Sequence, residues 1–183
     1  MNLEELIKAC KKQDRDAQKE LYQRYKSVLY MVSLKYCRNS DEAEDILHDA
    51  FILIFNKIKS YSNKGSFEGW MKRIVINKSI DKYNKNKVVT NKILESTLSN
   101  ELTDVEITEK ITISLDSLLE FIQQLPDQYR LVFNLYQLDG FSHKEIAKML
   151  LISESTSKSN FHRAKISLKE KIEKYKYLNL EKS

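Results

Sequence analysis

The sequence contains few of the residues that usually interrupt helices. Pro126 is the only proline among 183 residues, and there are three glycines. Helices tolerate this scarcity, whereas the turns of an all-β or α/β chain need more such residues. The sequence therefore predicts a nearly all-helical protein. Its length suits one compact domain or, as we expect, two small ones with a linker.

Cysteine, histidine and long apolar runs are also scarce. Cys10 and Cys37 form no CxxC pair, and the three histidines lack metal-ligand spacing, so we expect no metal and no cofactor. The first sixteen residues, MNLEELIKACKKQDRD, carry charges where a signal peptide would need an apolar core. No run of about 18 uncharged apolar residues follows. These absences predict a cytoplasmic protein that does not insert into a membrane.

Charge is sorted into blocks along the chain, although the net charge is only +5. Residues 39–55 contain acidic side chains and no Lys or Arg, for a local charge of about −5. Residues 72–87 and 158–176 each carry about +5. A nucleotide bias of the genome would enrich lysine throughout without separating the signs. We therefore expect one acidic surface and two basic ones. The basic surfaces indicate an acidic partner.

Apolar residues at helical spacing predict three helices in the first half of the chain, at about residues 16–37, 40–58 and 67–84. Ser40 and Ser66 are positioned to cap the second and third of these helices. The pattern lapses over residues 88–114, which we interpret as a linker.

The second predicted helix carries acidic and apolar side chains that its own domain does not obviously use. The macrodipole explains acidic residues in the first turn, but Asp45 and Asp49 lie farther along. Apolar side chains outside the predicted buried face are Ile52, Leu53 and Phe55. The helix therefore requires a second neighbour, either another helix of the domain or a separate protein whose basic residues meet Asp45 and Asp49.

The helical pattern returns at Leu115 and continues to the end of the chain. Pro126 suits the first turn of a helix with Tyr129, Val132, Phe133 and Tyr136 on one face, and Gly140 suits its end. Ser142 and Glu145 match a capping box for the next helix. Ser153 is positioned to cap the last one, whose accessible residues are expected to be Lys158, Ser159, Arg163 and Lys165.

Three segments of the sequence resemble the sigma-70 family. The segments SDEAEDILHDAFILIFNKIKSY and GSFEGWMKRIVINKSIDKYNK resemble its region 2. The segment LPDQYRLVFNLYQLDGFSHKEIAKMLLISESTSKSNFHRAKISLKEKI resembles its region 4. Extracytoplasmic-function (ECF) sigma factors consist of region 2, a linker and region 4, with little else. The resemblance implies an all-α fold, with a region 2 domain over 1–87, a flexible linker over 88–114 and a region 4 helix-turn-helix domain over 115–183.

The resemblance also implies roles for region 2 residues. Asp45, Asp49 and Leu53 match positions that bind the clamp helices of the large catalytic subunit of core RNA polymerase. Tyr61 and Asn77 match positions that frame a pocket for a base flipped from the minus-10 element, where an aromatic ring stacks and an amide reads the base edge. Cations for the phosphates of the melted strand would be Arg73, Lys78 and Lys82.

Structural alternatives exist for some of these residues. Tyr61 could close the core beneath its loop, and Asn77 could be a hydrogen-bonding residue inside the helix. We expect Asp81 to be structural and to hold Lys78 or a neighbouring backbone group, because a carboxylate repels phosphate.

In region 4 the resemblance assigns Lys158, Ser159, Arg163 and Lys165 to the minus-35 element. Arg163 is our candidate for reading sequence, because only arginine offers a bidentate fork to a guanine edge. Departures from the family pattern are Leu151 and Ser155 for glycine, Ser157 for valine and Asn160 for a basic residue. A left-handed Leu151 would cost about 1 kcal/mol. Fewer cations predict weaker minus-35 binding.

Three classes of function differ in how many of these residues they explain. A sigma factor would bind core RNA polymerase and promoter DNA, and an anti-sigma factor would be a further partner by analogy with ECF relatives. An autonomous regulator would leave the acidic helix and Tyr61 unexplained. A nucleic-acid enzyme would need convergent carboxylates for a metal, which acids spread along a helix do not supply. We predict a sigma factor and no enzyme.

Overall fold

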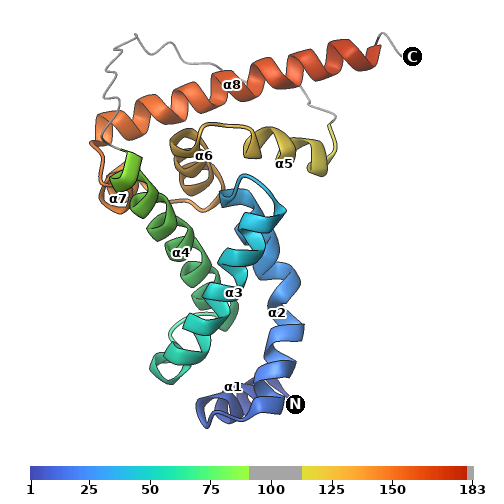
Figure 1. The fold of residues 1–183 in the computed structure, drawn as a ribbon, viewed down its shortest axis with the longest axis vertical. Coiled ribbons are helices and arrows are strands. Elements are labelled where there is room, and N and C mark those ends of the chain that lie inside the picture. The colour runs from blue at the N-terminus through green and yellow to red at the C-terminus, as the bar shows by residue number, and fades with distance from the viewer. Residues whose placement is uncertain (91–112, 181–183) are drawn as a thin grey trace. The chain divides into compact units, whose positions relative to one another are not determined.

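The structure is a computed structural model that describes residues 1–90 and 113–180, with side chains described for 1–86 and 113–177. Every regular element in these residues is a helix, which confirms the predicted all-α fold (Figure 1). The chain divides into two compact units, Met1–Asp81 and Lys82–Ser183. Most of the predicted linker, residues 91–112, lies outside the described residues.

The first unit contains α1 (Leu3–Lys11), α2 (Arg15–Tyr36), α3 (Ser40–Lys57), the short 3-10 helix η1 (Ile58–Ser60) and the first part of α4 (Phe67–Thr90). Helices α2 and α3 pack along each other (Figure 1). Fully buried side chains at the centre of the unit are Leu21, Leu29, Ile46, Ile54, Met71 and Val75. Val28 of α2 is exposed.

Helix α1 is not predicted by the sequence pattern, because nine residues are too short to establish a period. A capping box closes its start: the Glu5 amide donates to Asn2 Oδ1 (2.9 Å) and the Asn2 amide to Glu5 Oε2 (3.2 Å). Buried apolar residues on its inner face are Leu6, Ile7 and Cys10. Burial raises the pKa of the Cys10 thiol to about 11, so this thiol is unreactive at neutral pH.

The caps of α3 and α4 differ in how well they were predicted. Asn39, and not Ser40, caps α3: its Oδ1 accepts from the Glu42 amide (2.9 Å). The prediction was wrong by one residue because both side chains can cap a helix. Ser66 caps α4 as predicted, with Oγ 3.0 Å from the Gly69 amide. A Cβ at Gly69 would lie 2.8 Å from that oxygen, so a larger residue there would require the Ser66 side chain to shift.

The second unit contains α5 (Leu115–Gln123), α6 (Asp127–Phe133), the π-helical turn η2 (Asn134–Leu138), α7 (His143–Leu150) and α8 (Glu154–Leu180). Helix α8 runs across α5 and α6 (Figure 1). Buried residues at that contact are Ile122, Leu125, Ala164 and Leu168. Helix α5 begins at Leu115 as predicted, capped by Ser114, whose Oγ accepts from the Ser117 amide (3.1 Å).

The face predicted for α6 is largely packed. Val132 is fully buried, and Tyr129 and Phe133 pack against the cluster of buried residues shared with α5 and α8. Tyr136 is exposed, and Leu131 and Leu135, which the predicted face did not include, are buried as well. Arg130 is also buried, donating to the carbonyls of Gln123 (2.8 Å) and Leu125 (2.9 Å) and pairing with Asp127 (2.6 Å).

Candidate nucleic-acid and protein interfaces

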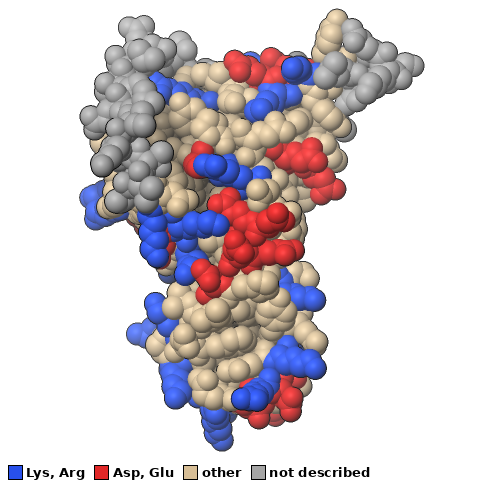
Figure 2. Space-filling view, viewed as in Figure 1, with Lys and Arg blue, Asp and Glu red and all other residues tan. Residues whose placement is uncertain are grey.

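The exposed face of α3 combines acidic and apolar side chains. Asp45 and Asp49 are one turn apart and both exposed, and Leu53, one further turn along, is half-buried. Ile52 beside them is 61% exposed, which is unusual for an isoleucine. Figure 2 shows acidic side chains gathered over the first turns of α3. The described chain therefore leaves part of the second apolar face of α3 uncovered.

One predicted polymerase contact pairs with one predicted DNA contact. Lys78 Nζ of α4 lies 3.0 Å from Asp49 Oδ2 of α3. The Lys78 side chain is 30% exposed and that of Asp49 is 54% exposed. Lys78, one of the two partners expected for Asp81, thus pairs instead with a carboxylate of α3.

The remaining predicted minus-10 residues lie along α4. Arg73 and Asn77 are exposed and four residues apart, so they share one face of the helix. No hydrogen bond to the Asn77 side chain is found within the described part of the chain, which does not fit the alternative of a hydrogen-bonding residue inside the helix. Lys82 is half-buried one turn beyond Lys78.

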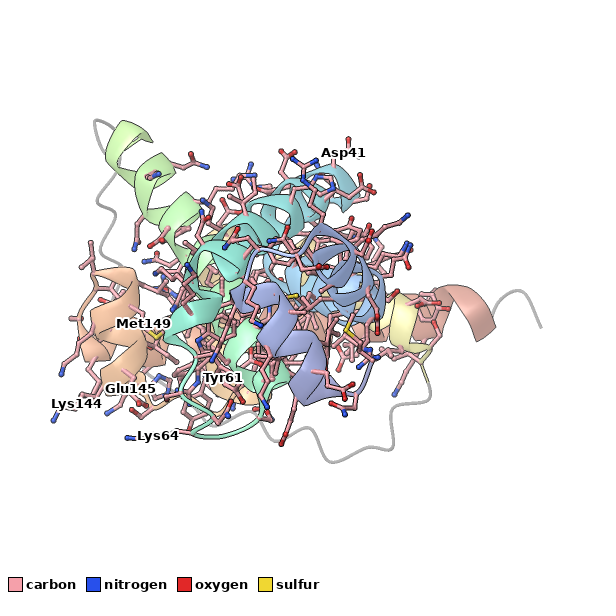
Figure 3. The ribbon with its side chains drawn as sticks, turned by 90° about the horizontal axis from the view of Figure 1, so that it is seen from below. Asp41, Tyr61, Lys64, Lys144, Glu145 and Met149 are labelled. Atoms are coloured by element: carbon pink, nitrogen blue, oxygen red, sulfur yellow. The ribbon has the colours of Figure 1, made fainter. Side chains whose placement is uncertain are left out.

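Tyr61 is packed into the first unit and is only 8% exposed. Its ring centroid lies 4.9 Å from that of Phe67 and 5.4 Å from that of Trp70. Its hydroxyl donates to the Gly65 carbonyl (2.8 Å). Figure 3 shows Tyr61 beside the loop that carries Lys64, with Asp41 on the opposite side of the unit. These contacts favour the core-closing alternative for the free chain, and a stacked base would require the loop at residues 62–66 to open.

Helix α7 and the turn after it have the geometry that the sequence predicted. The Ser142 amide donates to Glu145 Oε2 (2.8 Å), and the Glu145 amide donates to Ser142 Oγ (3.3 Å). The Ser142 hydroxyl also donates to Glu145 Oε2 (2.7 Å). This bond and, secondarily, the one from the Ser142 amide lower the pKa of the Glu145 carboxyl. Leu151 ends α7 in the left-handed conformation (φ 54°, ψ 52°) and is 72% exposed. Ser153 then caps α8, accepting from the Thr156 amide (3.0 Å).

The first half of α8 carries the predicted minus-35 residues. Lys158 is exposed and pairs with Glu154 (3.1 Å), and Ser159 is half-buried. Lys165 Nζ lies 5.2 Å from the Phe161 ring centroid. Arg163 is less accessible than expected: it is half-buried, and its Nη1 donates to Tyr129 Oη (3.4 Å).

Comparison with known proteins identifies both halves of the chain. A family model described as sigma-70 region 2 matches residues 21–88, and one described as sigma-70 region 4 matches residues 115–168. The chain belongs to the sigma-70 family. The ECF RNA polymerase sigma factor SigW of Bacillus subtilis is 31% identical over 94% of this chain and 97% of its own length, which identifies the ECF group.

Other sigma factors support this membership. The ECF sigma factor SigM of Bacillus subtilis is 29% identical over 82% of this chain and 91% of its own length. The sigma factor RpoE of Bartonella quintana, solved in complex with the anti-sigma factor NepR, has a similar fold. Its TM-score is 0.51 at 18% identity, over 85% of this chain and 96% of that one.

Two departures from the sigma-70 region 4 pattern point inward. Asn160 is 4% exposed and Ser157 is fully buried. The Asn160 side chain therefore faces the core, and weaker minus-35 binding stays a prediction. Its neighbours Lys158 and Ser159 are exposed and half-buried, so its burial could not be read from the adjacent residues.

His143, for which the sequence pattern predicts no contact, connects α7 to α8 in the sigma-70 helix-turn-helix. Its Nδ1 lies 2.9 Å from Ser157 Oγ, and its ring stacks on Tyr136 with centroids 4.2 Å apart. Burial lowers the pKa of His143, and the Lys158 ammonium lowers it further. Ser157 in place of valine is the only sequence signal that could have indicated a polar partner here.

Searches for metal and membrane sites in the described ranges, 1–90 and 113–180, found neither. No group of three or more His, Cys, Asp or Glu residues there could hold a metal ion. No helix in those ranges is both long enough and apolar enough to cross a membrane.

Proposed function

We propose that this chain is an ECF-type sigma factor that binds core RNA polymerase, recognises minus-35 and minus-10 promoter elements and initiates transcription. The observation that carries the proposal is that region 2 and region 4 occur in this order on one chain, which matches SigW over nearly its full length. A sigma factor directs the polymerase and is not itself an enzyme. The proposed site of action is the cytoplasm, and no cofactor is needed.

The proposed contact with core RNA polymerase is the exposed face of α3. Asp45 and Asp49 would meet basic residues of the clamp helices, and Leu53 would add an apolar contact. The exposure of both carboxylates, and of Ile52 beside them, supports this assignment. Opposite charges across such a face accelerate association and select the partner.

The proposed minus-10 surface combines the loop after η1 with α4. Tyr61 and Asn77 would hold a flipped base, while Arg73, Lys78 and Lys82 would bind phosphates of the melted strand. The exposure of Arg73 and Asn77 supports this surface. Tyr61 requires a change in the loop, and Lys78 must exchange Asp49 for a phosphate.

The proposed minus-35 surface is the start of α8, which would lie in the major groove. Lys158 and Lys165 would supply affinity through phosphates, Ser159 would contact phosphate or a base edge, and Arg163 would read a guanine. An anti-sigma factor remains a predicted partner, and we assign no surface to it.

Retention of core RNA polymerase by the immobilised full chain tests the proposal. We expect stoichiometric retention of the core subunits at moderate salt. An autonomous regulator would instead bind promoter DNA without retaining polymerase, and that result would refute the sigma assignment.

A further inference from the structure

We propose that α1 supports the surface that recognises the minus-10 element, and that Lys11 is a positioning residue for Tyr61. This inference rests on the proposed function. Residues 1–20 lie before the span that matches sigma-70 region 2. The helix they contain nevertheless contacts the loop on which base recognition would depend.

Helix α1 is fixed firmly enough to position another segment. Its start is closed by the capping box of Asn2 and Glu5. Its apolar face is buried, and the helix packs against both α2 and η1. Lys11, in the last turn, is half-buried and therefore has a defined position relative to η1.

Lys11 holds the backbone of Tyr61. Its Nζ donates to the Tyr61 carbonyl (3.1 Å), and the Tyr61 amide donates to the Ile58 carbonyl (3.2 Å). Both backbone groups of Tyr61 are thus bound where η1 ends and the loop begins. Because the donor is an ammonium, the bond to the carbonyl is stronger than one between neutral groups.

The Tyr61 side chain fixes the other end of the same loop. Its hydroxyl bonds to Gly65, and its ring packs against Phe67 and Trp70. Opening the loop for a base would break the contacts of the side chain but can leave the bond from Lys11 to the backbone in place. Lys11 would therefore keep the backbone of Tyr61 fixed while its ring moves from the protein core to the base.

A selection experiment with the reconstituted holoenzyme tests this role. Core RNA polymerase would be combined with the wild-type chain, Lys11→Met, Lys11→Arg or Lys12→Met. Each holoenzyme would select from promoter fragments whose minus-10 non-template strand is unpaired and randomised. Lys12→Met is the matched control, because Lys12 is the next residue, is exposed and loses the same charge.

We expect Lys11→Met to reduce the preference at one minus-10 position by about two- to tenfold, which is less than the full loss of a charged hydrogen bond because Lys11 acts on the base only through Tyr61. Lys11→Arg should retain most of the preference, and Lys12→Met should equal wild type. Trp70 is the only tryptophan and lies against Tyr61, so its emission should change in Lys11→Met but not in Lys12→Met. Circular dichroism would verify that each variant is folded.

The outcomes separate the inference from the function on which it rests. Equal preference in Lys11→Met and Lys12→Met would overturn the role of Lys11. So would a uniform loss of affinity for all sequences, which would make Lys11 a phosphate contact. If the wild-type holoenzyme selected no minus-10 sequence at all, the proposed function would fail, and the role of Lys11 with it.

Discussion

The Asp49 carboxylate lies 3.0 Å from the Lys78 ammonium, so a residue of the proposed polymerase face pairs with one of the proposed DNA face. Each group partly neutralises the other in the free chain. Exposed pairs of this kind contribute about 0.2 to 1 kcal/mol, which corresponds to at most about a fivefold change in affinity. Under the proposed function, the pair would therefore modulate DNA binding without abolishing it.

Asp49→Asn should raise the affinity of the full chain for single-stranded DNA by about two- to fivefold, because it releases Lys78. Fluorescence anisotropy at low salt measures this change. Asp45→Asn is the matched control, since it removes the same charge one turn earlier on α3. When Lys78→Gln is added to each variant, Asp49→Asn and Asp45→Asn should have the same affinity for single-stranded DNA. If Asp45→Asn raises the affinity as much as Asp49→Asn, only net charge matters and the pair has no role.

Asp45→Lys should weaken binding to core RNA polymerase at least tenfold, about 1.4 kcal/mol, because it opposes like charges across the interface. Titration of labelled chain with core polymerase measures the affinity. Glu173→Lys makes the same charge change on α8 and should leave the affinity unchanged. Equal affinities for the wild type and Asp45→Lys would remove α3 from the polymerase interface.

Arg163→Ala should cost about 1 to 3 kcal/mol at the preferred minus-35 sequence and relax the preference for it. Transcription from a set of minus-35 variants by the reconstituted holoenzyme measures both effects. Arg163→Lys keeps the charge but lacks the bidentate fork, so it should restore affinity without restoring the preference. A uniform decrease across all promoters in Arg163→Ala would identify a phosphate contact instead.

Leu151→Gly should stabilise the second unit by about 1 kcal/mol, because glycine adopts the left-handed conformation without the strain of a Cβ. Thermal unfolding measures the change. Leu138 is also exposed but has no positive φ, so Leu138→Gly should destabilise the unit and serves as the control. Destabilisation by Leu151→Gly would mean that the leucine side chain contributes more than its strained backbone costs.

His143 should make the stability of the second unit depend on pH. Its folded pKa is lowered below 6.5, so the unfolded chain binds the proton more tightly, and stability is lost as pH falls below about 6.5. Lys158 adds to this shift, whereas Glu154 opposes it. His143→Phe retains a ring to stack on Tyr136 but does not titrate. Urea unfolding between pH 7.5 and about 5 should show a shallower decrease for the variant; identical slopes would contradict the assignment.

The sequence predicted the long helices and several of the caps, though not the one at Asn39, because these signals are local. The capping box of Ser142 and Glu145, the cap at Ser66 and the left-handed Leu151 all depend on neighbouring residues. Which side chains of α6 are fully buried does not depend on neighbouring residues alone. Both sides of that segment are apolar, so the helices packed against it decide which side chains are buried.

Side-chain partners from distant segments could not be predicted. The contacts of Lys11 with Tyr61 and of Asp49 with Lys78 join different helices, and no spacing rule connects their positions. Burial was misjudged for the same reason at Asn160, whose polar character indicated a surface that the fold does not give it. Membership of the sigma-70 family was predictable because the region 2 and region 4 motifs are contiguous stretches.

Promoter-dependent transcription tests the central claim most directly. Core RNA polymerase would be combined with the purified chain on a library of duplex promoters with randomised minus-35 and minus-10 elements, and the transcripts would be sequenced. We predict transcripts that start at a fixed distance from two enriched elements and that depend on the chain. Retention of polymerase without such transcripts, or transcripts unchanged when the chain is omitted, would contradict the assignment as a sigma factor.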